Sequence, residues 1–148
     1  MSNHFTYLLR VRYAECDAQG VVFNAKYLEY IDVANTEFFR AVMGSYQQLV
    51  EQGMETQVVG VTMDWNAPAR FDDVVAITLS TQRIGNTSFT LKADFNNHET
   101  GQHLLSADIT YVMVGITDEG FVKIAVPDDM RLTLEQGGID VVVNHAGV

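Results

Sequence analysis

One stretch of the sequence decides the fold: Tyr13-Ala14-Glu15-Cys16-Asp17-Ala18-Gln19-Gly20-Val21-Val22-Phe23-Asn24-Ala25-Lys26-Tyr27-Leu28. It continues a run from Phe5 in which every second residue is apolar, the pattern of a strand with one buried face. Gly20 predicts a tight turn, because glycine tolerates a positive φ. A helical pattern begins at Ala25. The stretch therefore predicts a strand, a turn that carries Asp17, and a helix that starts beside that acid.

The helix is predicted to run from Ala25 to Met43, with Gly44 as its C-terminal stop. We expect Asn24 to be its N-cap, because the side-chain oxygen can accept a hydrogen bond from an amide of the first turn. Apolar residues recur with the helical period and form a wide face, at Tyr27, Leu28, Tyr30, Ile31, Ala34, Phe38, Phe39, Ala41 and Val42. A narrow polar stripe lies opposite, at Lys26, Glu29, Asp32, Thr36 and Arg40. This distribution predicts a helix that is buried on most sides.

The sequence after this helix is dominated by alternating apolar and polar residues. A short helix near residues 46–50 is expected to end at Gly53, and strands are predicted over residues 59–65, 75–80, 89–95, 103–114 and 121–125. The predicted fold class is therefore α+β, with an antiparallel sheet of five to six strands wrapped around one long helix. We expect one domain over residues 1–148, with a core over about residues 5–130. The tail after Pro127 has little pattern, although Met130, Leu132 and Leu134 can pack.

The composition excludes several functional classes. The formal net charge is −10 and the pI is about 4.6, which argues against a nucleic-acid binder or a protein that binds anionic membranes. Cys16 is the only cysteine, so no internal disulfide can form. The sequence shows neither a signal-peptide pattern near Met1 nor an apolar run of membrane-spanning length. The expectation is a soluble cytoplasmic protein without membrane insertion.

Asp17 is the first candidate for a catalytic residue. It lies between a strand end and a helix start, where a carboxylate can serve as a nucleophile or a general base. The competing interpretation is structural, because an aspartate before a glycine commonly accepts a backbone hydrogen bond in an Asx turn. The spacing alone favours this structural role. The residues around Asp17 must be considered together to decide between the two.

Other reactive side chains fit a catalytic role less well. Glu29 and Asp32 fall on the polar stripe with Lys26, where solvation or an i,i+3 ion pair is the expected role. Glu15 is expected to pair with a neighbouring donor. No histidine lies at a sequence spacing from Cys16 that would indicate a catalytic base for the thiol, which argues against a thiol nucleophile. The four histidines have no metal-ligand spacing, so no metal and no cofactor are expected.

Taken together, residues 11–30 resemble the signature of the 4-hydroxybenzoyl-CoA thioesterase family of the hotdog fold. The matching elements are the Tyr-x-Glu-x-Asp run that ends at Asp17, the Gly-Val-Val that follows, and the Asn-x-x-Tyr-Leu that opens the helix. The segment Pro68-Ala69-Arg70-Phe71-Asp72-Asp73, the pair Ser88-Phe89 and the region of Pro127 are also similar to the family. The resemblance covers about residues 5–130. It is specific for the family and not for the substrate.

The resemblance implies an acyl-CoA thioesterase in which a curved antiparallel sheet wraps around the long helix. It implies that Asp17 lies at the catalytic centre and that the backbone amide near Asn24 points at the thioester carbonyl. Whether Asp17 attacks the carbonyl or activates a water stays open. Gly20, Phe23 and Tyr27 of the same motif are expected to contact the substrate.

The sequence also departs from the family. Several relatives have histidine at the position of Asn24, and many have arginine at that of Asn35. A protonation role for that histidine cannot transfer, whereas an amide at Asn24 remains. Another branch of the hotdog thioesterases uses a helix carboxylate, which keeps Glu29 and Asp32 open as alternatives.

The implied partner is acyl-CoA, whose phosphates need local positive charge in an acidic protein. Arg70, close to Pro68 at a strand end, is favoured over Arg83, Lys92, Lys123 and Arg131 for this contact. The alternative function is a hotdog module that binds acyl-CoA without turnover, as a sensor or scaffold. Asp17 argues for the enzyme, because a pure binder gains nothing from an anion next to a carbonyl. A dehydratase of this fold would need a histidine near the helix start.

The last expectation is a homo-oligomer, a dimer or a tetramer, with active sites at the subunit interface. The wide apolar face of the helix and the unpaired sheet edges of a lone meander both favour it. Relatives in the family form such dimers, and often tetramers built from two of them.

Overall fold

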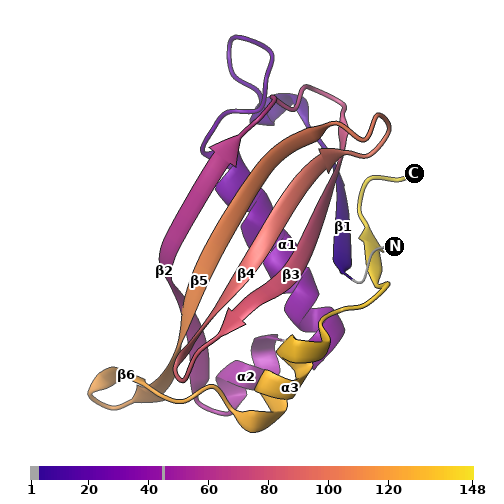
Figure 1. Cartoon of the computed structure of the whole chain (residues 1–148). Coiled ribbons are helices and arrows are strands. Elements are labelled where there is room, and N and C mark those ends of the chain that lie inside the picture. Colours follow the sequence, from indigo (N-terminus) through magenta and orange to yellow (C-terminus); the bar gives the residue numbers. More distant parts are fainter. Residues whose placement is uncertain (1–3, 45) are drawn as a thin grey trace.

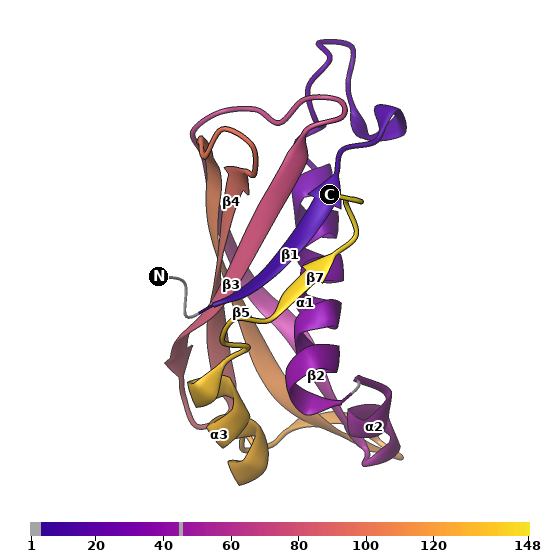
Figure 2. The ribbon, with the colours of Figure 1, turned by 90° about the vertical axis from the view of Figure 1, so that its right-hand side faces the viewer.

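A long helix lies across one face of a curved sheet in the computed structural model, which describes residues 4–44 and 46–148 (Figures 1 and 2). Residues 1–3, part of the N-terminal segment considered above for a signal peptide, and residue 45 lie outside the described residues. The elements are β1 (Phe5–Arg10), the 3₁₀ turn η1 (Tyr13–Glu15), α1 (Lys26–Met43), α2 (Tyr46–Glu51), β2 (Met54–Trp65), β3 (Val74–Ile84), β4 (Ser88–Asn97), β5 (His103–Thr117), β6 (Gly120–Lys123), α3 (Asp128–Gln136) and β7 (Val142–Asn144).

The strands pair in the order β2-β5-β4-β3-β1-β7, and β6 pairs with β5. From β3 to β5 the chain forms an antiparallel meander, with Ile77 opposite Phe95 and Leu91 opposite Ile109. β1 joins the other side of β3 and places Tyr7 opposite Ile77. The predicted α+β class, a sheet wrapped around one long helix, is confirmed.

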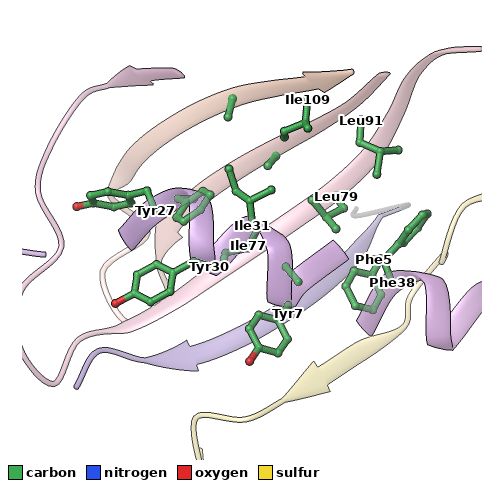
Figure 3. Packing of buried hydrophobic residues seen from close by; sticks show 14 of the residues in the cluster. Phe5, Tyr7, Tyr27, Tyr30, Ile31, Phe38, Ile77, Leu79, Leu91 and Ile109 are labelled. Carbon is green, nitrogen blue, oxygen red and sulfur yellow. The ribbon is translucent and has the colours of Figure 1, made fainter. Parts of the chain in front are cut away.

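The hydrophobic core lies between α1 and the sheet (Figure 3). Phe38 of α1 meets Phe5 of β1 edge to face, with ring centroids 5.5 Å apart. Residues at alternate positions of the strands complete the cluster, among them Ile77, Leu79, Leu91 and Ile109. The period of two in the strands and the helical period of α1 therefore bury one common surface, which fixes the helix across the sheet.

The C-terminal tail corrects the predicted sheet. β7 pairs in parallel with β1, with Thr6 opposite Val142, so the sheet of the described chain is mixed and has seven strands. The hydroxyl of Tyr7 lies 2.9 Å from Nδ1 of His145, which adds a side-chain contact to this pairing. α3 buries Met130 and Leu134 as expected, whereas Leu132 is exposed and the expectation that it packs is wrong. A strand of three residues carries too little alternation to be predicted from sequence.

The surface of α1 differs from the prediction in one respect. The helix buries its sheet-facing residues, but Leu28 is 43% exposed and Val33 is 46% exposed. The expectation that α1 is buried on most sides is therefore wrong for a single chain. The edge strand β2 is also apolar and open, and Val59, 62% exposed, lies at a break in its register with β5. Leu28 lines a hollow with Val61 and Met63 of β2, so an apolar surface is exposed there, whereas Val33 lies beside Tyr7 and His145 on the other side of α1.

Candidate active site

Asp17 lies in a tight turn between η1 and α1. The segment that joins β1 to α1 forms the upper end of the molecule in Figure 1. Its backbone N–H donates to the carbonyl of Val21 at 2.8 Å, and the N–H of Gly20 donates to the carbonyl of Asp17 at 3.0 Å. Gly20 has φ = 77°, which explains the need for glycine here. Oδ1 of Asp17 accepts the N–H of Gln19 at 2.8 Å, the Asx turn foreseen as the structural role. Oδ2 has no hydrogen-bond partner among residues 4–44 and 46–148, so half of the carboxylate stays available.

Backbone contacts hold this turn against the loop that follows β2. Cys16 and Val22 form an antiparallel bridge across the turn, and Val21 forms another with Arg70. The N–H of Val22 also donates to the carbonyl of Ala69 at 2.9 Å. The position of Asp17 is therefore set by main-chain pairing and not by side-chain packing alone.

The helix start corrects one sequence prediction. α1 begins at Lys26, its N-cap position is Ala25, and no side chain caps it, so Asn24 is not the N-cap. Asn24 lies one residue earlier, in a turn closed by a 2.8 Å hydrogen bond from the N–H of Lys26 to the carbonyl of Phe23. Alanine has no oxygen to accept an amide proton. Independently of this, the N–H groups of Asn24 and Ala25 have no hydrogen-bond acceptor in the described part of the chain.

A cavity of about 510 Å³ opens between the Asp17 turn, the start of α1 and the loop after β2. Its lining residues are Asp17, Val21, Val22, Phe23, Asn24, Tyr27, Trp65, Asn66, Ala67 and Pro68. The structure thus brings together four of the predicted site residues, Asp17, Phe23, Asn24 and Tyr27. Gly20 is not among the lining residues and shapes the turn instead.

The wall from the end of β2 was not predicted from the sequence. Trp65, Asn66, Ala67 and Pro68 line the cavity together with Asp17. The sequence placed Trp65 in a predicted strand and Pro68 in a segment similar to the family, but it assigned neither to the site. A second hollow, also about 510 Å³, shares Asn24 and Trp65 with the first and continues along β2. Its other lining residues are apolar: Ala25, Leu28, Val61 and Met63. An acid, two free amides and an apolar extension therefore meet in one place.

Tyr27 supports the cavity floor. Its side chain is buried, and its hydroxyl accepts the N–H of Ala69 at 3.1 Å. Burial raises the pKa of Tyr27, and the nearby charges of Cys16 and Asp17 act in the same direction, against the opposing hydrogen bond from Ala69. Tyr27 therefore stays neutral and fixes the loop after β2 to the first turn of α1. Its ring contributes lining surface, and substrate contact by Tyr27 remains a prediction.

Glu15 organises the segment before Asp17, in the pairing role predicted for it. Oε1 accepts the N–H of Arg12 and the hydroxyl of Tyr30, both at 2.8 Å, and Oε2 accepts Nη2 of Arg12 at 3.1 Å. Burial alone would raise the pKa of Glu15, but the hydrogen bonds from Arg12 and Tyr30 outweigh it, so the pKa is lowered. The carboxylate is therefore a buried structural anchor of the Asp17 turn.

We expect Glu15→Gln to destabilise the fold by about 2 kcal/mol at neutral pH, because a buried charge-assisted hydrogen-bond network loses its charge. The contribution of Glu15 is fully present above its ordinary pKa of 4.5 and is lost as pH falls through the lowered folded-state value. Urea unfolding of both proteins from neutral to acidic pH measures this effect, and the difference between them should shrink in acid.

The matched control is Glu29→Gln, which removes an exposed carboxylate that pairs with Lys26 at 2.8 Å. Such exposed pairs contribute about 0–1 kcal/mol, so this variant should unfold close to the wild type. A Glu15 variant with wild-type stability at neutral pH would contradict the anchoring role.

The alternative acids on α1 do not reach the Asp17 cavity. Glu29 is exposed and paired with Lys26, and Asp32 is exposed. Burial, and then the charge of Asp32, raise the pKa of Tyr111 on β5. Neither acid lines either hollow. The geometry therefore favours Asp17 over Glu29 and Asp32 as the catalytic carboxylate.

Arg70 lies beside the Asp17 turn but outside the cavity lining. Its side chain is exposed, and its backbone N–H donates to Oδ2 of Asp73 at 2.8 Å. No hydrogen bond or ion pair of its guanidinium occurs within the described residues. A phosphate-binding role for Arg70 therefore stays a prediction that its position permits.

Several other chemistries find no site in the described parts of the chain. Residues 4–44 and 46–148 contain no group of three or more histidine, cysteine, aspartate or glutamate side chains that could hold a metal ion. Burial raises the pKa of Cys16, and Glu15 and Asp17 raise it further, which disfavours a thiolate nucleophile. None of the helices in these residues has the length and apolar character needed to cross a bilayer.

Known proteins share this architecture and parts of the sequence. A sequence model described as the thioesterase superfamily matches residues 19–102, a range that starts just after Asp17. The acyl-CoA thioester hydrolase YbgC of Escherichia coli is 33% identical over 95 residues, which cover 64% of this chain and 71% of YbgC. The long-chain acyl-CoA thioesterase FadM of Escherichia coli is 26% identical over 128 residues, 86% of this chain and 95% of FadM.

A solved structure gives the likeness in three dimensions. The 4-hydroxybenzoyl-CoA thioesterase of Pseudomonas sp. strain CBS-3 superposes with a TM-score of 0.80 and covers 89% of this chain and 99% of that one. The two sequences are 24% identical, so this match shows a shared fold and nothing about the substrate.

Proposed function

Because this chain belongs to the thioesterase superfamily and is a thioester hydrolase, we propose that it hydrolyses acyl-CoA to a free acid and coenzyme A. The hotdog fold and the family resemblance inferred from the Asp17 motif are both confirmed. The observation that carries the proposal is the cavity that Asp17 and the residues just before α1, Phe23 and Asn24, line together.

The start of α1 supplies the polarising group in this proposal. The N–H groups of Asn24 and Ala25 have no acceptor in the described chain, and the positive end of the 18-residue helix dipole lies at the same place. A thioester carbonyl oxygen that accepts these amides is polarised, and the oxyanion formed on attack is stabilised. The side chain of Asn24 is not needed for this role.

Asp17 supplies the second group. As a nucleophile, its carboxylate attacks the carbonyl carbon, the C–S bond breaks, coenzyme A leaves as a thiolate, and water then hydrolyses the acyl-aspartyl anhydride. As a general base, Asp17 takes a proton from a water that attacks the carbonyl directly. Both routes suit a carboxylate whose Oδ1 accepts the N–H of Gln19 while Oδ2 has no hydrogen-bond partner among the described residues.

The alternative is an acyl-CoA-binding module without turnover. Asp17 argues against it, because an anion next to the thioester carbonyl adds nothing to binding and suits hydrolysis. The test is thiol release from a panel of acyl-CoA thioesters of different acyl length, followed with a thiol reagent. We expect release well above the rate without protein. Tight binding of the panel without any thiol release would support the module instead.

We also propose that two copies of the chain associate through β2. This strand is the open edge of the sheet, and Val58, Val59 and Val61 are exposed on it. Exposed edges promote pairing with another strand, and the exposed Leu28 of α1 lines one apolar hollow together with Val61 and Met63 of β2. A second copy on β2 would also close the hollow that continues the Asp17 cavity, so the site would be shared.

Light scattering of the purified protein should therefore give a mass of at least twice the 16.5 kDa of the chain. Val59→Lys should lower the mass to that of one chain, because lysine on an edge strand blocks pairing. The matched control is Val142→Lys, at a similarly exposed valine on the opposite edge strand β7, which should stay dimeric. A wild-type monomer that still hydrolyses acyl-CoA would refute the shared site.

A further inference from the structure

Two large aromatic side chains stand in solvent beside the Asp17 turn. Tyr13 is 80% exposed and Phe71 is 55% exposed. Their ring centroids lie 5.8 Å apart and their planes meet at 89°. The pair therefore forms a corner, in which a flat group can stack on one ring while its edge meets the other.

Hydrogen bonds fix the two turns that carry these rings. Tyr13 opens η1, the turn that Glu15 anchors. Phe71 lies in a turn closed by a 3.1 Å hydrogen bond from the N–H of Asp73 to the carbonyl of Arg70. Asp72 in that turn has φ = 68°, a left-handed conformation that costs free energy for a residue other than glycine. The fold thus maintains two exposed rings on well-defined turns.

The two turns are joined to each other and to the cavity. The N–H of Asp72 donates to the carbonyl of Val11 at 3.0 Å, which ties the Phe71 turn to the segment before Tyr13. Phe71 follows Arg70, whose backbone pairs with Val21 of the Asp17 turn. The aromatic corner therefore lies on the rim of the proposed active site.

From this placement we propose that Tyr13 and Phe71 bind the adenine of coenzyme A, an inference that rests on the proposed acyl-CoA hydrolysis. Coenzyme A carries its thioester and its adenine at opposite ends of a flexible pantetheine arm. With the thioester in the cavity, the adenine needs a surface outside it. Aromatic rings stack on any base, and the attraction does not depend on net charge. Such a contact suits a chain with a net charge of −10.

Arg70 provides the contact for the phosphates of the same nucleotide. The other two arginines of this rim are engaged, Arg10 with Asp72 at 3.4 Å and Arg12 with Glu15 at 3.1 Å. Arg70 is exposed and has no such partner among residues 4–44 and 46–148. A guanidinium binds phosphate oxygens through paired hydrogen bonds, and here it stands next to Phe71 in the sequence.

The test compares two thioesters of the same acyl group, one of coenzyme A and one of pantetheine, which lacks the nucleotide. The measured quantity is kcat/KM for the coenzyme A thioester divided by kcat/KM for the pantetheine thioester. Tyr13→Ala and Phe71→Ala should each lower this ratio about tenfold, as expected for the loss of one base-stacking contact. Arg70→Gln should lower it as well and weaken its dependence on salt. Phe121→Ala, at an equally exposed ring on β6 at the far end of the molecule, should leave the ratio unchanged (Figure 1).

Equal losses on both thioesters would overturn the proposal, because the rings would then serve the fold or the acyl site. A change of mass by light scattering in Phe71→Ala would also overturn it, since the pair would belong to a subunit interface. A calorimetric titration with adenosine diphosphate needs no turnover. Binding that weakens about tenfold in Phe71→Ala would support the nucleotide surface even if no acyl-CoA were hydrolysed. Hydrolysis with an unchanged ratio would refute the nucleotide surface and leave the proposed function intact.

Discussion

Asp17→Asn is expected to keep the fold and to lose about 10²-fold or more in kcat for thiol release, because a nucleophile or general base is removed. The substitution of Asp17 by asparagine is compatible with the turn in which residue 17 lies. An asparagine Oδ1 can still accept the N–H of Gln19, so the Asx turn at the cavity is retained. Thermal unfolding should therefore give a Tm close to that of the wild type. Single-turnover and steady-state assays with the most active acyl-CoA then measure the loss.

The controls for this prediction are the two acids on α1. Glu29→Gln and Asp32→Asn should hydrolyse acyl-CoA at near wild-type rates, because neither residue lines the cavity. Wild-type turnover in Asp17→Asn, together with a large loss in one of the α1 variants, would move the catalytic acid to the helix. The same set of variants thus decides between the two positions.

Asn24→Pro should reduce kcat by about 10²–10³-fold, the cost of losing one oxyanion donor. Proline removes the N–H of residue 24 and leaves the rest of the helix start unchanged. Asn24 is the second residue of the turn from Phe23 to Lys26, a position that favours proline. A Tm near that of the wild type would show that the variant is folded.

Asn24→Ala is the matched control, because it keeps the N–H and removes only the side chain. Its activity should fall modestly. Its stability should also change little, since Asn24 does not cap α1, whereas loss of a true N-cap would cost about 1 kcal/mol. An alanine variant as inactive as the proline variant would assign the chemistry to the side chain of Asn24 and contradict the amide proposal.

Local signals explain what the sequence could predict of the fold. α1 was predicted to begin at Ala25 and begins at Lys26, and its end at Met43 agrees with the prediction. Both limits could be predicted because the helical period of the apolar residues and the glycine after the helix are local features of the sequence. β7 was missed because its pairing with β1 is decided by a partner far away in the chain. The length of β2 was underestimated for a related reason. Its N-terminal half, from Met54, is held by β5.

In the candidate site, too, features set by neighbouring residues were predicted, and features set by contacts between distant segments were not. Asp17, Phe23, Asn24 and Tyr27 lie in one motif, so a single turn brings them to the cavity. The opposite wall around Trp65 could not be predicted, because it is fixed by contacts such as that between Tyr27 and Ala69. The N-cap was assigned wrongly because asparagine and alanine are neighbours here, and the turn from Phe23 shifts the helix start by one residue.

The pairing of β7 with β1 has a consequence for biosynthesis. β1 leaves the ribosome before its partner strand, because the His145 that contacts Tyr7 of β1 is synthesised 138 residues later. Until then, β3 can cover one edge of β1, and the other edge keeps its backbone hydrogen-bonding groups unpaired. While these residues are synthesised, the nascent chain therefore carries a strand with one unpaired edge, and neighbouring chains on one polysome can pair with that edge in competition with β7.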